Sequence, residues 1–333
     1  MTNKKIIGKK FENNNLKKVF AKDIVPADDA FHGSSKRFAI EWWYFEAKLN
    51  NGYTVVVTPT TQFKNLIVFP CIELYKDGEL KVRAIKRYLF NNFQVNKNYP
   101  FVKLLDEKII DFDYEKYNKT GEWVYNISTK IDNYEINLNF VGITKGWKME
   151  FFKQIWIVAL PKANVTGEIA INGTKMKVNG IGYHDHNCGS DLSKLFNITG
   201  WYWGKIMSET YTVTWANIAK KSSKEEILAV LNQDKQGYFN INPENIYFKP
   251  DNLIRNYGRK MPIDYTLKIN DVVNDIPIHV DVKMEVKNIH RRYKKLLIAP
   301  YWRYHVKATG VISVGANIET VKSTQIIEFF RAI

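Results

Sequence analysis

The densest run of reactive side chains lies near the middle of the chain and is bounded by glycines. Five polar side chains follow one another there without interruption: Tyr183, His184, Asp185, His186 and Asn187. In an extended strand successive side chains point to opposite faces, so Tyr183, Asp185 and Asn187 should share one face and the two histidines the other. The flanking glycines also permit a bulge.

Three interpretations of this run compete. His184 and His186 could bind a metal, but the nearby Glu and the distant further His of a cupin-type site are not evident, so no metal is expected. The run could instead be a structural hydrogen-bond network at a domain junction, in which Asp185 fixes the histidines and Tyr183. In the third interpretation the carboxyl group acts as an acid or base, because burial among aromatic rings raises its pKa and leaves it protonated.

A second cluster lies near the start of the chain and contains Glu41, Trp42, Trp43, Tyr44 and Phe45. Alternation predicts that Trp43 and Phe45 face a core, whereas Trp42 and Tyr44 lie on the opposite face. Two large rings there imply a second buried surface, at a ligand cavity or a domain interface. Glu41 is costly to bury alone, so we expect a basic or histidine partner. The expected companions of these rings are Trp156, Trp201 and Trp203.

The elements that position these clusters are predicted to be strands. Aromatic residues make up 14% of the chain, and most lie in short segments with the two-residue period of strands. The second cluster falls on an expected strand at 40–49, the reactive run follows an expected strand at 175–184, and the best helix candidate is Ser222 to Leu231. Further strands are expected at 53–58, 68–75, 122–131, 134–141, 148–159, 165–171, 202–206, 211–218, 276–286, 302–314 and 319–330.

The two halves of the sequence also resemble each other. Setting Trp43 against Trp201 superposes Tyr53 on Tyr211 without a gap. Chance similarity between β sequences of biased composition is the alternative explanation. Three further matches join the ends of the halves: Gly167 with Gly310, Val178 with Val321 and Asp185 with Glu328.

Length and composition limit the domain organisation and the class of protein. A chain of 333 residues suggests two domains, which we place at 31–192 and 193–333 after a basic N-terminal extension, 1–30. The longest apolar stretches are too short to cross a bilayer, and no apolar stretch follows the N-terminal lysines, so we expect a cytoplasmic protein. Cys71 and Cys188 lie far apart, which excludes a disulfide scaffold or zinc ribbon.

The charge and the motifs exclude further classes. The net charge of +15 comes from lysines spread along the whole chain, and no nucleic-acid-binding signature accompanies it, so no nucleic acid is expected as a partner. The sequence contains no phosphate-binding loop, dinucleotide fingerprint, hydrolase nucleophile elbow or zincin motif. Nucleotide, dinucleotide and zincin chemistry are therefore disfavoured.

At the two clusters the chain resembles the lipocalin-like family that contains the carotenoid hydratases (hydroxyneurosporene synthases) and the fungal Diels-Alderases of polyketide decalin formation. The resemblance covers residues 30–333. It rests on Glu41-Trp42-Trp43-Tyr44-Phe45, on Trp156 with Pro161 downstream, on Gly182-Tyr183-His184-Asp185-His186-Asn187 followed by Gly189, and on the closing hairpin from Gly310 to Glu328.

The resemblance implies an all-β fold of two tandem lipocalin-like (calycin-type) antiparallel β-barrel or sandwich domains with an apolar, aromatic-lined pocket. It also implies reactions that need no cofactor. In such hydratases the acidic residue of a Tyr-x-Asp motif is thought to protonate a terminal double bond, and Tyr183 and Asp185 occupy those positions. In the Diels-Alderase-like members the pocket folds the substrate into a reactive conformer. The chain departs from the hydratases at Gln154 and Trp156, where those enzymes use a His.

We therefore expect a cofactor-independent enzyme, a hydratase or a cyclase of the lyase or isomerase class, that acts on a hydrophobic isoprenoid-like or polyketide-like substrate by hydration, cyclisation or isomerisation. Asp185 would be the acid and Tyr183 its hydrogen-bonding partner, while His184 and His186 would orient them. The expected substrate-binding residues are Glu41, Trp42, Tyr44, Trp156, Asn187, Trp201 and Trp203.

Two alternatives belong to other classes. One is a non-catalytic lipocalin-like protein that binds or carries a hydrophobic ligand, with peripheral contact to an anionic membrane through its basic N-terminus. The other is a structural module whose aromatic faces are fully packed. The sequence indicates no oligomeric state.

Overall fold

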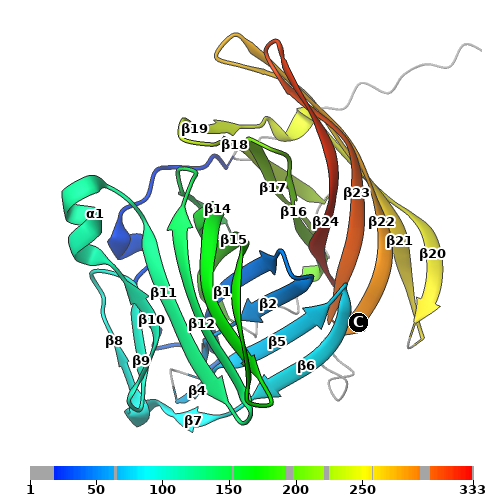
Figure 1. Cartoon of the computed structure of the whole chain (residues 1–333). Coiled ribbons are helices and arrows are strands. Elements are labelled where there is room, and N and C mark those ends of the chain that lie inside the picture. The colour runs from blue at the N-terminus through cyan, green and yellow to red at the C-terminus, as the bar shows by residue number, and fades with distance from the viewer. Residues whose placement is uncertain are drawn as a thin grey trace, which may run out of the picture.

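The computed structural model describes residues 19–63, 66–151, 154–191, 198–220, 225–256, 258–292 and 301–331. Within these ranges the chain forms two large antiparallel sheets. Figure 1 shows the first sheet in blue to green and the second in yellow to red, curling beside each other. The predicted all-β, two-sheet architecture is confirmed.

The first sheet contains fifteen strands, all from the first 191 residues. They are β1 (Ala39–Leu49), β2 (Tyr53–Val57), β3 (Thr60–Gln62), β4 (Ile67–Phe69), β5 (Cys71–Lys76), β6 (Glu79–Ile85), β7 (Tyr88–Leu89), β8 (Phe93–Val95), β9 (Phe101–Leu104), β10 (Glu107–Phe112), β11 (Val124–Ile131), β12 (Tyr134–Gly142), β13 (Trp147–Phe151), β14 (Gln154–Ile171) and β15 (Thr174–Asp191). The main order is β6-β5-β2-β1-β15-β14-β12-β11-β10-β9-β8.

The second sheet contains nine strands. They are β16 (Ile198–Met207), β17 (Tyr211–Lys220), β18 (Glu226–Gln233), β19 (Gly237–Asn240), β20 (Ile246–Asn256), β21 (Arg259–Val273), β22 (Ile276–Arg291), β23 (Tyr301–Val314) and β24 (Asn317–Arg331). Their order is β19-β18-β17-β16-β24-β23-β22-β21-β20.

The helix predicted from Ser222 to Leu231 is wrong. Residues 225–231 belong to β18 or lead into it, and the first part of the predicted helix lies outside the described residues. Leu228 to Leu231 are all buried, because β18 pairs with β17 on one side and β19 on the other. The described α-helix is instead α1 (Tyr114–Thr120), and three short 3-10 turns lie at Pro26–Asp28, Phe90–Asn92 and Pro243–Asn245.

The central strands of the two sheets follow the same order. The run β2-β1-β15-β14 in the first sheet corresponds to β17-β16-β24-β23 in the second. Gly167 and Gly310, matched in the sequence, have φ angles of 149° and 154°, and a Cβ on either would meet a backbone carbonyl oxygen, of Asn137 and Asp281 respectively. The repeat that these closing matches predict is therefore present in the structure.

The opening match of Trp43 with Trp201 is wrong by one residue, because Asp185 pairs with Tyr44 whereas Glu328 pairs with Trp203, and this register sets Trp43 against Tyr202. The predicted boundary between the halves falls at residues 192–197, outside the described residues.

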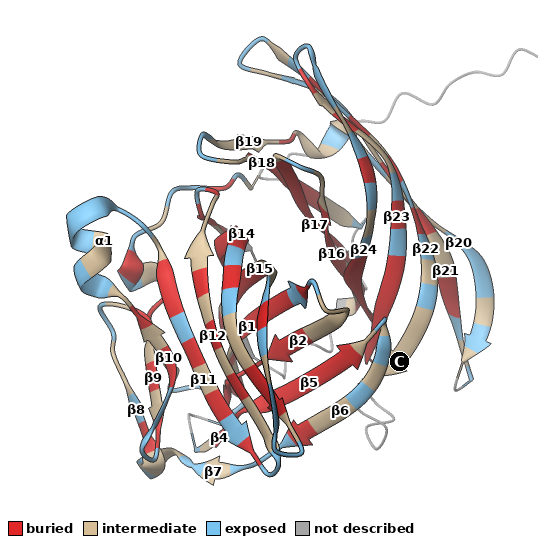
Figure 2. Ribbon diagram, viewed as in Figure 1, coloured by how far each residue is buried: buried red, intermediate tan, exposed pale blue. Residues whose placement is uncertain are grey.

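Buried apolar side chains form one core inside each sheet and a third cluster between the sheets. We call this third cluster the junction. It takes residues from β1, β2, β5, β13, β14 and β15 on one side and from β16, β17, β18 and β24 on the other. Figure 2 shows that β5, β16 and β17 are largely buried, whereas the outer strands β6 and β20 are not.

None of the helices in the described ranges has both the length and the apolar character to cross a membrane.

Candidate active site

The reactive run lies on β15 in regular pairing with β1, where His184 faces Phe45 and Asp185 faces Tyr44. Tyr183 and Asp185 point into the junction, and His184 and His186 point into the interior of the first sheet, so the predicted alternation is confirmed. The run therefore divides into two polar groups on opposite faces of one strand.

Asp185 lies on the junction face and is only 4% exposed. Its Oδ2 accepts two hydrogen bonds, from the Trp156 indole Nε1 at 3.0 Å and from the Tyr183 hydroxyl at 2.8 Å. Its Oδ1 accepts one long bond of 3.4 Å from the Asn187 amide. Asp185 and its three donors were all predicted as site residues, and the structure brings these four side chains together.

Burial raises the pKa of Asp185 to about 6, although the hydrogen bonds from Trp156 and Tyr183 oppose this effect. About one tenth of the carboxyl groups are therefore protonated at pH 7, and about half at pH 6. Because Oδ2 already accepts two donors, we place the proton on Oδ1. Of the three donors only Asn187 is partly exposed, so Oδ1 lies on the more accessible side of the carboxyl group.

The opposite face of β15 is organised by Asp29, which the sequence analysis did not single out. Its Oδ2 lies 2.9 Å from His184 Nε2 and accepts a 2.7 Å hydrogen bond from the Tyr125 hydroxyl. The other nitrogen of His184 lies 3.1 Å from the carbonyl oxygen of Tyr44. Burial alone would raise the pKa of Asp29, but the imidazoles of His184 and His186 hold it well below its usual value.

Glu41 lies on this interior face and not with the junction rings. Its Oε1 accepts a hydrogen bond of 3.0 Å from His186 Nε2. His186 is thus the histidine partner predicted for Glu41. Its carboxylate also accepts backbone N–H bonds from His32 at 2.9 Å and Gly33 at 2.8 Å. Burial opposes the charge of His186, but Asp29 and Glu41 together raise its pKa to about 9. His184 and His186 thus form a buried structural group, one strand face away from Asp185.

The aromatic residues expected at a substrate site gather in the junction. The Trp203 ring lies 5.5 Å from both the Tyr44 ring and the Tyr183 ring. Trp42 and Trp201 are only partly buried, and Trp201 stacks on Phe330 at 4.1 Å. In this structure the rings therefore contact one another and enclose the carboxyl group of Asp185.

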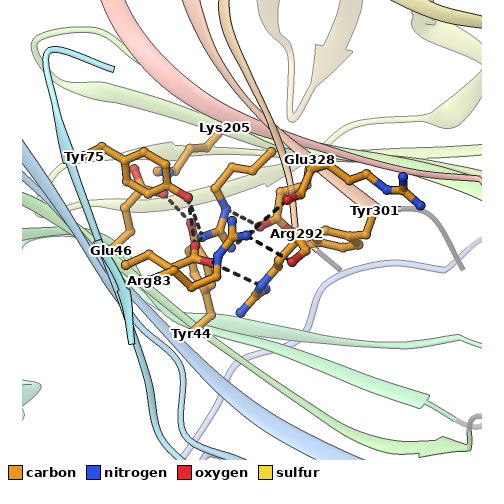
Figure 3. A network of polar contacts seen from close by, with 11 residues as sticks. Tyr44, Glu46, Tyr75, Arg83, Lys205, Arg292, Tyr301 and Glu328 are labelled. Carbon is orange, nitrogen blue, oxygen red and sulfur yellow. Dashed lines mark hydrogen bonds and ion pairs between the residues drawn. The ribbon is translucent and has the colours of Figure 1, made fainter. Parts of the chain in front are cut away.

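Beside these rings the junction holds a buried network of charges, which Figure 3 shows. Arg303 is fully buried on β23 and bridges the sheets, since it binds Glu73 of β5 and, at 2.6 Å, Glu328 of β24. A second bridge joins Glu46 of β1 to Lys205 of β16 at 2.6 Å. The sequence analysis missed these ion pairs because their partners lie far apart in the chain.

A pocket of about 280 Å³ opens at the same junction, lined by β1, β14, β15, β16 and β24 and by the turn after β16. The Glu46 and Lys205 pair lies in its wall, and Lys205 Nζ lies 4.9 Å from the centre of the Tyr183 ring. Gly182 also lines it, but the aromatic rings do not. The residues that line the pocket are thus mainly charged or polar, and Asp185 is not among them.

The described residues contain no group of three or more His, Cys, Asp or Glu side chains placed to hold a metal ion. Cys71 and Cys188 are both buried and free, and burial raises the pKa of the Cys71 thiol to about 11.

Two curled antiparallel sheets with this junction define a lipocalin-like β protein. Solved structures share the fold over nearly the whole chain. A candidate AttH protein from Nitrosomonas europaea has a TM-score of 0.63 and 14% identity, covering 94% of this chain and 98% of its own. Kievitone hydratase from Nectria haematococca has a TM-score of 0.56 and 12% identity, covering 93% and 96%.

A third solved structure is that of CghA, with a TM-score of 0.56 and 11% identity over 95% of this chain and 98% of CghA. CghA has also been solved with Sch210972. These likenesses establish the fold and confirm the lipocalin-like resemblance at that level.

Sequence similarity reaches two curated proteins over short stretches. The quinolone epoxide rearrangement protein penF of Penicillium thymicola is 26% identical over 115 residues, which is 33% of this chain and 32% of that protein. Hydroxyneurosporene dehydrogenase of Chlorobaculum tepidum is 30% identical over 86 residues, 24% of this chain and 22% of that protein. The match therefore spans a third or less of either relative. No family model matches the chain.

Proposed function

We propose that the protein is a cofactor-independent enzyme that acts on a hydrophobic, isoprenoid-like or polyketide-like molecule at the junction between its two sheets. The observation that carries the proposal is Asp185, a buried carboxyl group with a pKa of about 6 that is enclosed by aromatic rings. Perturbed titrating groups of this kind are concentrated at functional sites.

The hydrogen-bonding pattern assigns a role to each oxygen of Asp185. Oδ2 is held by Trp156 and Tyr183, which fixes the orientation of the carboxyl group. The Oδ1 proton passes to a substrate alkene carbon and leaves a carbocation, whose charge the faces of the surrounding rings stabilise. In a hydration, water then adds to the cation and returns a proton to the carboxylate. In a cyclisation or isomerisation, the cation loses a neighbouring proton to the same carboxylate.

The names of the relatives are compatible with this chemistry. One solved relative is a hydratase of kievitone, and one curated relative rearranges a quinolone epoxide. Both names denote the conversion of a small organic molecule. The substrate must reach Oδ1 from the side of Asn187, whose partner on β1 is the partly exposed Trp42.

The test uses the full-length protein and two isosteric variants, Asp185→Asn and the exposed control Asp275→Asn. Each protein is incubated in H2(18)O with a panel of isoprenoid alkenes and polyketide polyenes, and the masses of the products are measured by mass spectrometry. Uptake of (18)O identifies hydration, and a product of unchanged mass identifies cyclisation or isomerisation. We expect Asp185→Asn to lower kcat by at least about 100-fold while ligand affinity stays within about tenfold.

Two outcomes would overturn the proposal. Binding without turnover by the wild-type protein across the panel would favour the carrier alternative. Equal turnover by Asp185→Asn and wild type would remove Asp185 from the mechanism.

A further inference from the structure

The pocket at the junction is rich in lysine. Its lining includes Lys48 and Lys162 from the first sheet and Lys205 and Lys322 from the second, against the carboxylates of Glu46 and Glu209. Serine, threonine and glutamine side chains on β24 and in the turn after β16 also line it, together with Ile181, Gly182 and Met207. Positive charge from both sheets thus converges on one small volume.

Two of these lysines are already neutralised. Lys205 pairs with Glu46 at 2.6 Å, and Lys162 pairs with Asp234 at 2.7 Å while also donating to the carbonyl oxygen of Glu209. Both ammonium groups are largely buried, with side-chain exposures of 2% and 6%. They form the fixed floor of the pocket.

The other two lysines have no carboxylate partner in the part of the chain that the structure describes. Lys48 Nζ donates to a backbone oxygen, that of Thr324, at 3.2 Å. Lys322 lies on the outer rim of the pocket and is exposed. Burial lowers the pKa of Lys48, and Lys205 lowers it further against the opposing effect of Glu46. Lys48 and Lys205 thus repel each other, and an anion bound beside Lys48 would offset that repulsion.

We propose that this pocket binds a small oxyanion, the phosphate or carboxylate group of a metabolite, which Lys48 and Lys322 contact from opposite sheets. The volume of about 280 Å³ accommodates a group of this size. Because the two lysines belong to different sheets, the bound anion also holds the two halves of the protein together. The proposal is independent of any acid role for Asp185.

The test is isothermal titration of the full-length protein with pyrophosphate and, separately, with citrate, at an ionic strength held constant with sodium chloride. We expect saturable binding of at least one of the two anions. Tighter binding of pyrophosphate identifies a phosphate ligand, and tighter binding of citrate a carboxylate ligand. Both Lys48→Gln and Lys322→Gln should weaken binding by at least about fivefold, since each removes one charge contact.

Two matched variants separate a site from a general effect of charge. Lys260→Gln removes an exposed lysine on β21, three strands away from β24, and should leave binding unchanged. Lys48→Arg keeps the charge and should retain binding. The proposal is overturned if neither anion binds saturably with a Kd below about 10 mM, which corresponds to a binding free energy of about 3 kcal/mol. It is also overturned if Lys260→Gln weakens binding as much as the pocket variants do.

Discussion

Asp185 and Glu328 occupy matched positions in the two halves of the protein, yet their carboxyl groups have opposite kinds of partner. Glu328 binds the guanidinium of Arg303, with its Oε1 2.6 Å from Nη2 and 3.0 Å from Nε. The described donors to Asp185, by contrast, are the neutral side chains of Trp156, Tyr183 and Asn187. One half therefore uses this position for an ion pair, and the other keeps a carboxyl group without a cation bound to it.

Asp185 should make the protein less stable as the pH rises. Its folded-state pKa of about 6 lies above the ordinary value of 3.8, so folding favours the protonated form, and stability is lost as the pH rises from about 4 through 6. The full loss is about 3 kcal/mol by pH 8. Urea denaturation at pH 5 and pH 8 measures the part of this loss that falls between those two pH values, about 1.4 kcal/mol. Asp185→Asn should be more stable than wild type at pH 8, and Asp275→Asn should not. Equal pH slopes for wild type and Asp185→Asn would contradict the shift.

His186 should also make the protein less stable as the pH rises, but over a higher pH range than Asp185. Its pKa is raised from 6.5 to about 9, so its contribution to stability is complete below pH 6.5 and is lost as the pH rises through 9. His186→Gln leaves Asp29 and Glu41 buried with less compensation and should cost about 3–5 kcal/mol at pH 7. Thermal unfolding between pH 7 and 10 tests this, with the exposed His279→Gln as control. A wild-type protein equally stable at pH 7 and pH 10 would show that the imidazole is not charged.

Arg303 should hold the two sheets in one cooperative unit. Arg303→Met leaves Glu73 and Glu328 buried without their shared cation, which should cost about 3–5 kcal/mol. Arg303→Lys keeps the charge but cannot bridge both carboxylates in the same way, so a smaller loss is expected. In calorimetry we expect a single unfolding transition for the wild-type protein and a broadened or split transition for Arg303→Met. The exposed Arg331→Met on β24 is the control, because it removes the same charge outside the network, and a split in that variant too would point to a general effect of charge.

The matched glycines should be intolerant of any side chain. At Gly167 a Cβ would overlap the backbone of Asn137, and backbone cannot move aside cheaply, so Gly167→Ala should lose more than about 2 kcal/mol. Gly310→Ala should lose a similar amount, because its Cβ would meet the backbone of Asp281. Gly237→Ala is the control, since a Cβ there meets nothing within 4 Å. Chemical denaturation of the three variants would decide, and a harmless Gly167→Ala would mean that β12 and β14 can separate locally.

Strand alternation predicted much of the site from the sequence. The separation of Trp43 and Phe45 from Trp42 and Tyr44 required only the two-residue period, and the same period placed Asp185 opposite to the histidines. The histidine partner of Glu41 followed from the cost of burying a lone carboxylate. These features depend on local geometry, which a single sequence carries.

What the sequence did not reveal depends on distant contacts or on competing local signals. Asp29 lies in a segment without strand periodicity, so nothing marked it as the partner of the histidines. The helix α1 was not predicted, although Asp113 is its N-cap and Gly121 adopts the left-handed conformation at its end. The predicted helix near Leu228 failed because the pairing of β18 with β17 and with β19 overrides weak local preference.

The contact between Asp29 and His184 spans 155 positions of the chain. At usual rates of translation the ribosome needs on the order of ten seconds to make that stretch. During that interval Asp29 has been synthesised and His184 has not. The interior of the first sheet can therefore close only late in synthesis. A nascent chain arrested before β15 would therefore expose a half-built core, and that is the stage at which a chaperone would have the most to bind.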